Sequence, residues 1–404
     1  MRSEKISIKN RDGHLLSCQL DLPLDEKPKA YLLFAHCFTC NKNLTAIRNI
    51  SLAITSQGFA LVRFDFTGLG ESEGEFSETN FASTVNDLID VYDYFTKENK
   101  QPQVLIGHSL GGSAVVFAAG QLPDVKAIVT VGAPSDPGHV EHLLKDGISD
   151  IEKNGCGIVD IGGRNFTIKK QFLEDIRSHS LPETLKQLKK PILVCHSPQD
   201  SVVGIDNARK LFESAYHPKS FVSLDGANHL LSDSKDSRFA GNMIASWIER
   251  YLSIDEANLS NQKSTNQVNV RITKEKYTTE ILSGEHRLLA DEPKSVGGKD
   301  LGPNPYDLLL SALGACTVMT LRMYADRKGW ELDEVEVGLD HKKDYPADCE
   351  DCENPKQKID VIERKIRVEG NLTEEQKSRI LEIADLCQIH KTLHSPVDII
   401  SSMN

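Results

Sequence analysis

Residues 103 to 112 read QVLIGHSLGG and place Ser109 in a G-x-S-x-G motif. The apolar run before Ser109 is typical of a buried strand, and the stretch GGSAVVFAAG near it is compatible with a helix. The small residues Gly107 and Gly111 permit the strained strand-to-helix turn that exposes a serine hydroxyl. The stretch therefore predicts a nucleophile elbow and, with it, a sheet whose strands alternate with helices.

Similar apolar runs recur on both sides of the elbow. Each is rich in β-branched and aliphatic residues, and they cover 29–36, 59–66, 103–109, 125–134, 191–197 and 219–226. Such runs, spaced for crossover helices, indicate an α/β architecture with a mostly parallel sheet covered by helices on both faces. The charged stretch 135–188 interrupts the series. We interpret it as a cap over an active site in preference to ordinary crossover helices.

A serine nucleophile needs a base, and the base needs an acid that orients it, because a free hydroxyl barely ionises at neutral pH. His229, in LDGANHLL, follows the last predicted strand of the sheet, and Asp200, in VCHSPQD, follows the strand before it. The order Ser, Asp, His is the one that such an elbow predicts. Asp225 is a weaker acid candidate because it lies four residues before His229. We expect His108 and His196 to serve in packing or in local hydrogen bonds.

Acyl transfer also needs two backbone N–H groups that point at the developing negative charge of an oxyanion. We expect one from Leu110, directly after the nucleophile at the start of the helix. The other is expected from Phe38, at the turn in AHCFTCNKN. Together they predict an oxyanion hole beside Ser109.

Taken in chain order, DFTGLGES at 65–72, GHSLGG, HSPQD and GANH resemble the α/β-hydrolase superfamily over residues 1–252. The resemblance implies hydrolysis of an ester or similar acyl bond of a small-molecule substrate through an acyl-enzyme on Ser109. Many relatives have His-Gly where this chain has His36-Cys37, so Cys37 either crowds the oxyanion hole or simply fills it. An inactive hydrolase fold with an intact triad is the alternative, because fold does not fix function.

A chain of 404 residues exceeds what one hydrophobic core usually organises, so two domains are expected. Residues 253–266 are rich in Asn, Ser and Gln and are interpreted as a linker. Beyond it, the segments 269–276, 334–343 and 359–370 alternate like half-buried strands, and two apolar-striped segments favour buried helices. We therefore predict a separate α+β domain over residues 267–404.

The first of these helices carries Cys316, in SALGACTVM at 311–319. Cys316 shares one helix face with Leu309, Ala312, Met319, Thr320 and Met323. This face predicts a buried stripe far from the helix N-terminus. The second helix begins at a capping box of Thr373 and Gln376 and carries Cys387 on its apolar side. Periodicity alone favours two small buried hydrophobes.

GPNPYDLLLSALGACTVMT and the later C-x-I-H-K-T-L resemble the OsmC/Ohr family, the osmotically inducible and organic hydroperoxide resistance proteins, over residues 267–404. The resemblance implies an intertwined homodimer, an organic hydroperoxide as substrate and a thiol reductant as partner. It also implies that Cys316 attacks the peroxide to form a sulfenic acid, and that Cys387 condenses with it to a disulfide.

In the peroxidatic relatives an arginine ionises the thiol, and a glutamate orients that arginine. Arg287, in GEHRLLADEP, is the candidate thiolate-activating residue, whereas Arg322 is expected on another helix face. The glutamate position holds Tyr306, and the neighbouring Asp307 is a partial substitute. Gln388 also stands where relatives commonly have proline. These changes motivate a competing interpretation, in which the domain is a dimerisation or ligand-binding module that serves the hydrolase.

Charge and composition narrow the expected partners and compartment. A formal net charge of −12 argues against a nucleic-acid partner, because an acidic protein repels the phosphate backbone. No apolar run approaches the roughly 18 residues that cross a bilayer, so no membrane partner is expected. The N-terminus MRSEKISIKN lacks the pattern of a secretory signal, which favours the cytoplasm and mostly reduced cysteines.

No cofactor and no metal are expected. The sequence contains no phosphate loop, dinucleotide fingerprint or haem-attachment motif. The single C-x-x-C at Cys349 and Cys352 lacks the second ligand pair of a structural zinc site, and its acidic neighbours favour a solvated loop.

Overall fold

The computed structural model describes residues 2–24, 26–161, 163–252, 266–272, 276–284, 286–344 and 359–403. By internal packing the chain divides into two units. The first comprises Met1–Glu275 with Thr279–Leu288, and the second comprises Lys276–Thr278 with Leu289–Asn404. Most of the predicted linker, as well as Cys349 and Cys352, lies outside the described residues.

Three short antiparallel strands follow the predicted linker. They are β11 (Val268–Ile272), β12 (Thr279–Ser283) and β13 (His286–Ala290). The sequence analysis assigned them to the second domain, whereas β11, β12 and most of β13 group with the first unit. The Arg271 guanidinium donates to the Leu22 carbonyl, 3.4 Å away, within this unit.

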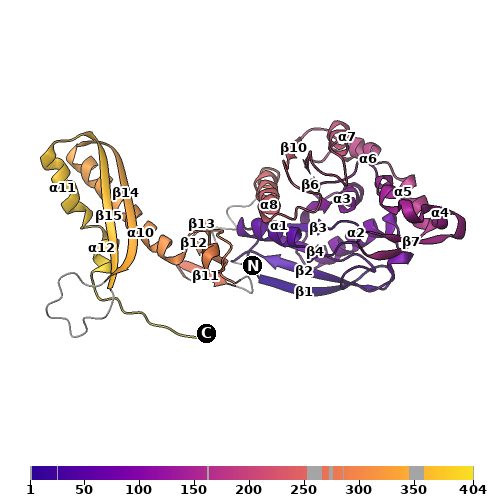
Figure 1. Cartoon of the computed structure of the whole chain (residues 1–404), viewed down its shortest axis with the longest axis horizontal. Helices are drawn as coiled ribbons and strands as arrows, with labels where there is room; N and C mark the ends of the chain where they lie inside the picture. Colours follow the sequence, from indigo (N-terminus) through magenta and orange to yellow (C-terminus); the bar gives the residue numbers. More distant parts are fainter. Residues whose placement is uncertain are drawn as a thin grey trace. The chain divides into compact units, whose positions relative to one another are not determined.

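An eight-stranded sheet forms the centre of the first unit (Figure 1). Its order is β1-β2-β4-β3-β5-β6-β9-β10. The bounds are β1 (Arg2–Lys9), β2 (Leu15–Leu22), β3 (Tyr31–Ala35), β4 (Ala60–Phe64), β5 (Pro102–His108), β6 (Ala127–Val131), β9 (Ile192–His196) and β10 (Lys219–Ser223). The six strands β4, β3, β5, β6, β9 and β10 pair in parallel in this order, while β1 and β2 are antiparallel additions at one edge. The predicted mostly parallel sheet is confirmed.

Strands β1 and β2 were not predicted. Strand β1 is the edge of the sheet and has the polar sequence RSEKISIK, most of which is exposed or half-buried. Because an edge strand buries little surface, it lacks the continuous apolar run by which the inner strands were recognised.

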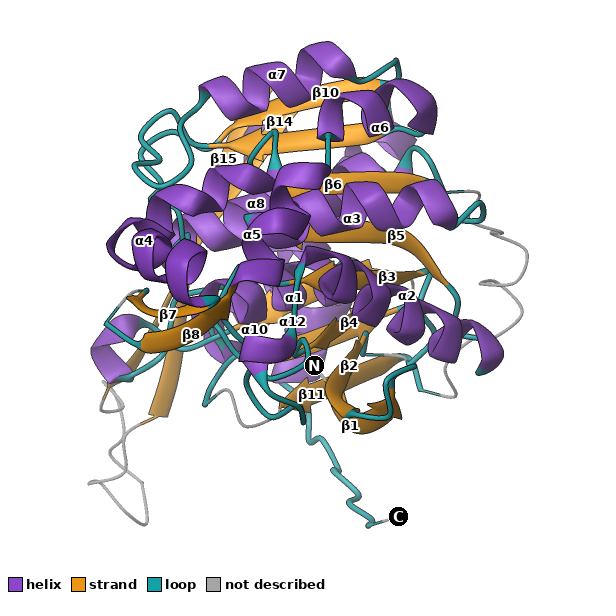
Figure 2. Ribbon diagram, turned by 90° about the vertical axis from the view of Figure 1, so that its right-hand side faces the viewer, coloured by secondary structure: helices purple, strands orange, loops and turns teal. Residues whose placement is uncertain are grey.

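Alternate residues of the central strands enter two apolar cores on opposite faces of the sheet. In β3, Leu33 packs into one core, whereas Leu32 and Phe34 pack into the other. Helices α1 and α8 cover the Leu32 side, and α2 and α3 cover the Leu33 side, where Figure 2 shows α3 along β5 and β6. Their bounds are α1 (Thr45–Ser56), α2 (Phe81–Lys97), α3 (Leu110–Gln121) and α8 (Ser234–Glu249).

The chain leaves the sheet between β6 and β9 and forms a lobe with its own two-stranded sheet. Its elements are η2 (Pro137–Leu144), α4 (Lys145–Asn154), β7 (Cys156–Asp160), β8 (Asn165–Lys169), α5 (Lys170–Ser178) and α6 (Leu181–Leu188), and α7 (Asp206–Ser214) follows β9. Phe172 of α5 stacks on Phe38, with ring centroids 5.3 Å apart. Phe166 of β8 contacts Phe76 of the short helix η1 (Phe76–Glu78), with centroids 5.2 Å apart. The lobe therefore lies against the Phe38 turn, as a cap would.

The second unit is built on one long helix and a two-stranded antiparallel sheet. Its elements are η3 (Lys294–Val296), α10 (Pro305–Lys328), β14 (Glu331–Asp344), β15 (Ile359–Asn371), α11 (Glu374–Ala384) and α12 (Gln388–Leu393). A small core joins them, formed by Leu321, Ala325, Leu332, Ile380, Ile383 and Ala384. The predicted α+β domain and the capping box at Thr373 and Gln376 are confirmed.

The predicted buried stripe on the Cys316 helix is wrong. Leu309, Met319 and Met323 are 37%, 64% and 64% exposed. The buried side of α10 is instead the one that carries Leu313, Thr317, Leu321 and Ala325. The reason is that the sheet and α11 cover one side of α10 only, so its other apolar side faces outward.

Helix α10 also corrects the expectation about apolar length. An 18-residue window of this helix has a mean hydropathy of 1.5, so by length and composition alone it could cross a membrane. A search for an unbroken apolar run does not find this helix, because Ser311, Gly314 and Thr317 interrupt the run. The mean hydropathy of the window nevertheless stays high.

Candidate active sites

The Ser109 turn has the geometry of a nucleophile elbow. Strand β5 ends at His108, Ser109 adopts φ 55° and ψ −127°, and α3 begins at Leu110. A positive φ is strained for a residue other than glycine, so the surrounding structure must hold it. A Cβ on Gly107 would lie 2.2 Å from the Gly111 carbonyl oxygen, and one on Gly111 would lie 2.4 Å from the His36 carbonyl oxygen. Both glycines are therefore required by close backbone approach.

The structure brings Ser109, His229 and Asp200 together. The three residues follow the carboxyl ends of β5, β10 and β9, which lie at one edge of the sheet. His229 Nε2 lies 3.0 Å from Ser109 Oγ, and His229 Nδ1 lies 2.7 Å from Asp200 Oδ2. When Nδ1–H donates to the carboxylate, Nε2 is left to accept the serine proton. The weaker acid candidate, Asp225, instead accepts a bond from the Ser223 hydroxyl at 2.6 Å.

The surroundings of Asp200 keep its carboxylate ionised. Burial acts to raise its pKa, but the hydrogen bond from His229 and the backbone N–H of Val203 outweigh this and lower the pKa. Asp200 Oδ1 accepts the N–H groups of Val202 at 2.8 Å and of Val203 at 2.9 Å. A charged, fixed carboxylate can orient His229 and stabilise its imidazolium form.

Two further histidines support the site without touching Ser109. His108 Nε2 lies 2.7 Å from the His229 carbonyl oxygen, and His196 Nε2 lies 2.7 Å from the Val203 carbonyl oxygen. Burial lowers the pKa of His108 to about 3 and also lowers that of His196, so both rings are neutral near pH 7 and donate through Nε2–H. They hold the His229 and Asp200 loops, which agrees with the local role predicted for them.

The predicted oxyanion-hole residues, Phe38 and Leu110, lie at the ends of β3 and β5. Both line the same pocket, with Leu110 at the first position of α3, where a helix leaves its N–H groups without an internal partner. In the described part of the chain, neither backbone N–H donates a hydrogen bond to another protein group. The pair is thus placed to act as predicted, although this role stays a prediction.

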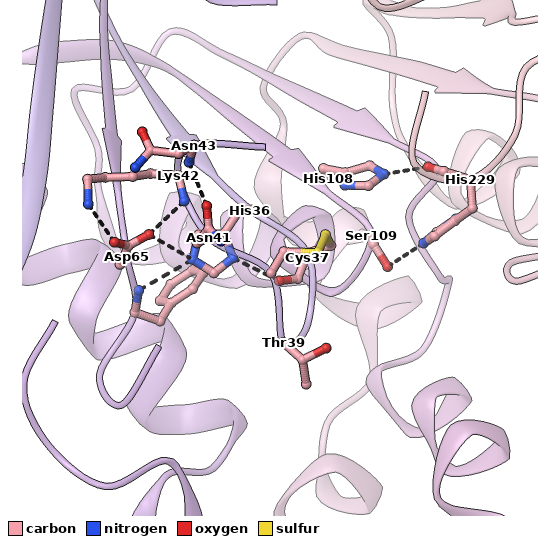
Figure 3. Close-up of a disulfide and its surroundings, with 12 residues drawn as sticks. His36, Cys37, Thr39, Asn41, Lys42, Asn43, Asp65, His108, Ser109 and His229 are labelled. Atoms are coloured by element: carbon pink, nitrogen blue, oxygen red, sulfur yellow. Dashed lines mark hydrogen bonds and ion pairs between the residues drawn. A yellow bond between two sulfur atoms is a disulfide. The ribbon is translucent and has the colours of Figure 1, made fainter. Parts of the chain in front are cut away.

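The turn that carries Phe38 contains a disulfide between Cys37 and Cys40 (Figure 3). Cys37 is therefore not a free thiol, but it still lines the pocket beside Phe38 and Leu110, so whether it crowds or fills the oxyanion hole stays open. Among the described cysteines this pair is bonded, whereas Cys18, Cys156, Cys195, Cys316 and Cys387 are free, so most of them are reduced as expected. The tight turn from Cys37 to Cys40 brings the two sulfur atoms within bonding distance. Sequence periodicity does not predict such a turn.

A buried ion pair anchors the chain after this turn (Figure 3). Lys42 is 1% exposed, and its Nζ lies 2.5 Å from Asp65 Oδ2 and 2.9 Å from Glu71 Oε2. The Arg63 guanidinium donates to the Lys42 carbonyl at 2.6 Å. The loop is thereby tied to β4 and to the turn at 65–72. This turn, DFTGLGES, is one of the motifs by which the chain resembles the α/β-hydrolase superfamily.

An apolar pocket adjoins the Phe38 and Leu110 backbone. Its aromatic and aliphatic walls are Phe38, Phe66, Leu69, Phe76, Leu110 and Phe172. Its polar side is made of Thr67, Thr79, Ser83, Thr84 and Asp87. This pocket could not be predicted from the sequence, because its walls come from segments that lie far apart in the chain, including the cap.

In the second unit, Cys316 and Cys387 lie close together as free thiols. Cys316 is half-buried on α10, and Cys387 is 1% exposed. Cys387 is not on the apolar side of α11 as predicted, because that helix ends at Ala384. It instead caps α12, where its sulfur accepts the His390 N–H at 3.3 Å.

Hydrogen bonds, rather than a cation, favour the thiolate of Cys316. Partial burial acts to raise its pKa, but the backbone N–H of Ile389, the Cys387 thiol and the backbone N–H of Gln388 outweigh this and lower the pKa. These donors could not be predicted from the sequence, because every residue except proline has a backbone N–H group.

The candidate arginine, Arg287, lies in the first unit, where its Nε would lie 3.1 Å from a Cβ at Gly58, whereas Cys316 lies in the second unit. Its role as the thiolate-activating residue stays a prediction. Arg364 of β15 is the cation near the thiol pair: it lies 3.4 Å from Thr317 Oγ1, which is 3.7 Å from Cys387 Sγ. Arg364 could not be singled out from the sequence, because it is one of several charged residues that alternate along β15.

The residues at the missing glutamate position have other partners. Tyr306 stacks on His341, with ring centroids 4.2 Å apart. Asp307 caps α10, since its carboxylate accepts the Asn304 N–H at 3.0 Å. The Asp307 carboxylate thus has a structural role in the helix cap, and its role as a partial substitute for the glutamate stays a prediction. Arg322 donates to the carbonyls of Leu332 and Asp333, away from the thiols, as expected.

Comparisons with known proteins divide the chain in the same way. Residues 26–146 match the family described as serine aminopeptidase, S33, and residues 297–402 match the family described as OsmC-like protein. The esterase domain of a Rhodothermus marinus protein is 48% identical, with a TM-score of 0.53, over 62% of this chain and 99% of that one.

More distant relatives share the fold of the first unit. Est1E from Butyrivibrio proteoclasticus, solved with ferulic acid, is 20% identical with a TM-score of 0.53, over 61% of this chain and 98% of that one. The mitochondrial palmitoyl-protein thioesterase ABHD10 of Rattus norvegicus is 24% identical over 213 residues, which are 51% of this chain and 70% of the relative. The chain therefore belongs to the α/β-hydrolase superfamily, as an esterase- and thioesterase-like hydrolase that continues into an OsmC-like domain.

Proposed function

We propose that the first unit hydrolyses a carboxylic ester or thioester with an apolar acyl group, through an acyl-enzyme on Ser109. The observation that carries this proposal is the hydrogen-bonded series Ser109 Oγ, His229 and Asp200, with distances of 3.0 and 2.7 Å. A serine placed in this way has both a base to take its proton and an acid that orients the base.

The geometry supports a two-stage reaction. Ser109 Oγ attacks the acyl carbonyl carbon while its proton moves to His229 Nε2, and the N–H groups of Phe38 and Leu110 stabilise the oxyanion. His229 then protonates the leaving alkoxide or thiolate as the acyl bond breaks. Water attacks the acyl-enzyme by the same route, with His229 as base, and releases the carboxylic acid and free Ser109.

The pocket supports an apolar acyl group. Its aromatic walls, among them Phe66 and Phe172, adjoin the proposed oxyanion donors, where the acyl carbon must lie. Burial of an apolar group there removes it from water at about 25 cal/mol for each Å². Asp87, on the polar side, accepts bonds from Asn10 at 2.8 Å and from the Thr67 N–H at 2.9 Å, which leaves it engaged with the protein.

A fluorophosphonate probe tests this proposal directly. The wild-type chain should be labelled at Ser109 and should hydrolyse p-nitrophenyl esters or acyl thioesters, whereas Ser109→Ala should do neither. Ser178→Ala, at an exposed serine of α5, is the matched control and should behave as wild type. Folded wild-type protein that takes up no label and hydrolyses no member of the panel contradicts the proposal.

For the second unit, we propose a thiol-dependent reduction of organic hydroperoxides. The adjacent free thiols of Cys316 and Cys387, and the lowered pKa of Cys316, favour it. The Cys316 thiolate attacks the peroxide oxygen, releases an alcohol and becomes a sulfenic acid. The Cys387 thiol then condenses with it, releasing water and forming a disulfide, which a thiol reductant returns to two thiols.

Cumene hydroperoxide and mass spectrometry test this step. Reduced wild-type protein should form a Cys316–Cys387 disulfide, and Cys387→Ser should stop at the Cys316 sulfenic acid, which a dimedone probe traps. Cys156→Ser is the matched control, because Cys156 is free and exposed in the first unit. Thiols at both positions that persist under excess peroxide would contradict the activity and favour a non-catalytic module.

The outward apolar side of α10 supports a homodimer through the second unit. Met319 and Met323 are each 64% exposed on it, and a second copy that covers this side would remove both from water. The double variant Met319→Lys/Met323→Lys should therefore be monomeric in sedimentation velocity, while the wild type is dimeric. Ile158→Lys, which changes an exposed apolar residue of the first unit, should leave the mass unchanged. A monomeric wild type would reject the dimer.

A further inference from the structure

The disulfide at the Phe38 turn takes no chemical part in the steps of ester hydrolysis. Cys37 and Cys40 enclose Phe38 and Thr39, and their Cα atoms lie 5.4 Å apart. Cys37 and Phe38 both line the pocket beside Leu110. Acyl transfer moves protons and an acyl group but changes no oxidation state, so the proposed reaction gives this bond no chemical role.

The disulfide closes a turn that its own backbone holds only in part. Thr39 adopts a φ of 61°, and a β-branched residue rarely takes this left-handed conformation. The backbone bond across the turn, from Cys40 N–H to the Cys37 carbonyl, is 3.2 Å long, at the upper end of the usual range. Arg164 of the cap also donates to the Thr39 carbonyl. Without the disulfide, Thr39 can relax to negative φ and turn the neighbouring Phe38 N–H away.

We infer that Cys37–Cys40 is a thiol-exchangeable redox site, and that its reduction by a dithiol opens the Phe38 turn and lowers the turnover of the hydrolase. The inference rests on the proposed function of the first unit. The oxidised chain is then the competent hydrolase, and in the reduced chain one of its two oxyanion donors is partly displaced.

The exposure of the two cysteines decides which sulfur atom the reductant attacks. Cys37 is 2% exposed, whereas Cys40 is half-buried, so an incoming thiolate reaches the Cys40 sulfur. A bond forms between the reductant and Cys40, and the Cys37–Cys40 bond breaks to release the Cys37 thiolate, which takes a proton. The second thiol of the dithiol then displaces Cys40. Two electrons pass to the protein, which gains two thiols, while the reductant becomes a cyclic disulfide.

The other cysteines of the first unit do not share this setting. Burial raises the pKa of the Cys18 thiol, and it raises that of Cys195 to about 12, so neither is a competent thiolate near pH 7. Cys156 is free and exposed on β7. It provides a matched control, because it meets any reagent in solution without touching the Phe38 turn.

The experiment measures p-nitrophenyl ester hydrolysis by the full chain in two redox states. One sample stays oxidised; the other is treated with dithiothreitol, freed of it anaerobically and then assayed. Alkylation followed by mass spectrometry reports the state of Cys37 and Cys40 in each sample. Cys156→Ser and the double variant Cys316→Ser/Cys387→Ser separate the other accessible thiols from the effect.

Loss of one oxyanion donor costs about 10²- to 10³-fold in kcat, so a partly displaced donor should cost about 10- to 100-fold. We expect this fall in kcat on reduction, with recovery after oxidised glutathione restores the bond, in the wild type and in both control variants. Cys40→Ser should be slow in both states and insensitive to dithiothreitol. If Cys40→Ser folds poorly, the reversible change in the wild type still decides the matter.

Two results overturn the inference. One is an unchanged kcat when Cys37 and Cys40 are both alkylated, and the other is a disulfide that dithiothreitol does not reduce in the folded protein. A chain that hydrolyses no ester in either state, and takes up no fluorophosphonate, removes the proposed function and this role of the disulfide with it. This outcome can be told apart from the first two, because alkylation still reports whether the Cys37–Cys40 disulfide exchanges with the dithiol.

Discussion

Ser109 and Cys316 are the nucleophile candidates of the two units, and their surroundings promote ionisation by different means. Ser109 has a general base, because His229 lies 3.0 Å away and is itself fixed by Asp200. Cys316 has no such base among the groups that shift its pKa, which are chiefly backbone N–H groups and the Cys387 thiol. The difference follows from chemistry: a hydroxyl must lose its proton to a partner as it attacks, whereas a thiol needs only a lowered pKa.

The two sites also differ in how much of their surroundings one chain supplies. Ser109 is 7% exposed, and its base, acid and pocket all belong to the first unit. Cys316 lies on a helix whose apolar side is largely outward, beside Met319 at 64% exposure. The geometry of one chain therefore defines the Ser109 site. The Cys316 site is tested through the reactivity of its thiols and the oligomeric state of the protein.

The largest expected effect is that of Ser109→Ala on ester hydrolysis. Removal of the nucleophile should lower kcat by about 10⁶-fold, because no other group can form the acyl-enzyme. Steady-state kinetics with a p-nitrophenyl ester measures the change. Peroxide consumption at Cys316 should be unaffected, since the two nucleophiles belong to separate units. A variant that keeps a tenth of wild-type activity would break the assignment of Ser109.

Asp200→Asn should have the next largest effect, about 10⁴-fold in kcat, because an amide no longer fixes the tautomer of His229 or stabilises its charge. The fold should survive, since the remaining amide oxygen can still accept the Val202 and Val203 N–H groups. Asp225→Asn is the matched control at the other acid candidate and should keep nearly full activity. Equal losses in the two variants would show that Asp200 is not the acid.

A third prediction compares thiols rather than hydrolysis. Because the pKa of Cys316 is lowered, its reactive thiolate should form at a lower pH than that of an ordinary thiol. Burial raises the pKa of Cys195 to about 12, so near pH 7 it should react about 10³-fold more slowly than Cys316. Iodoacetamide alkylation from pH 5 to 9, read by mass spectrometry, gives both rates. A Cys316 rate that rises only above pH 9 would contradict the lowered pKa.

The smallest effect is expected at the acyl pocket. Phe172→Ala removes one aromatic wall contributed by the cap, which should raise KM for esters with apolar acyl groups by about 10-fold. The effect on kcat should be slight, because the Phe172 side chain carries no group that transfers a proton. Phe239→Ala, at a residue of α8 that is 48% exposed, is the matched control. An unchanged KM across acyl chains of different length would place the acyl group elsewhere.

Much of the first unit could be predicted because its signals are local. The run before Ser109 marks a buried strand, and the glycines around it mark a backbone approach closer than a Cβ allows. Asp200 and His229 follow later strands of the same parallel sheet, and parallel strands deliver their carboxyl ends to one edge. The pocket could not be predicted, since Phe38, Phe66 and Phe172 meet only after the cap folds against the sheet.

The sequence by itself determined the two halves, the elbow at Ser109 and the helix that carries Cys316, because strand and helix periods and the glycine pattern are properties of neighbouring residues. Only the tertiary structure decided which side of α10 is covered, that Arg364 lies near the thiol pair, and that Cys37 is joined to Cys40. These depend on which surfaces pack together and on the path of single turns. Periodicity specifies that a face is apolar, but not which other face covers it.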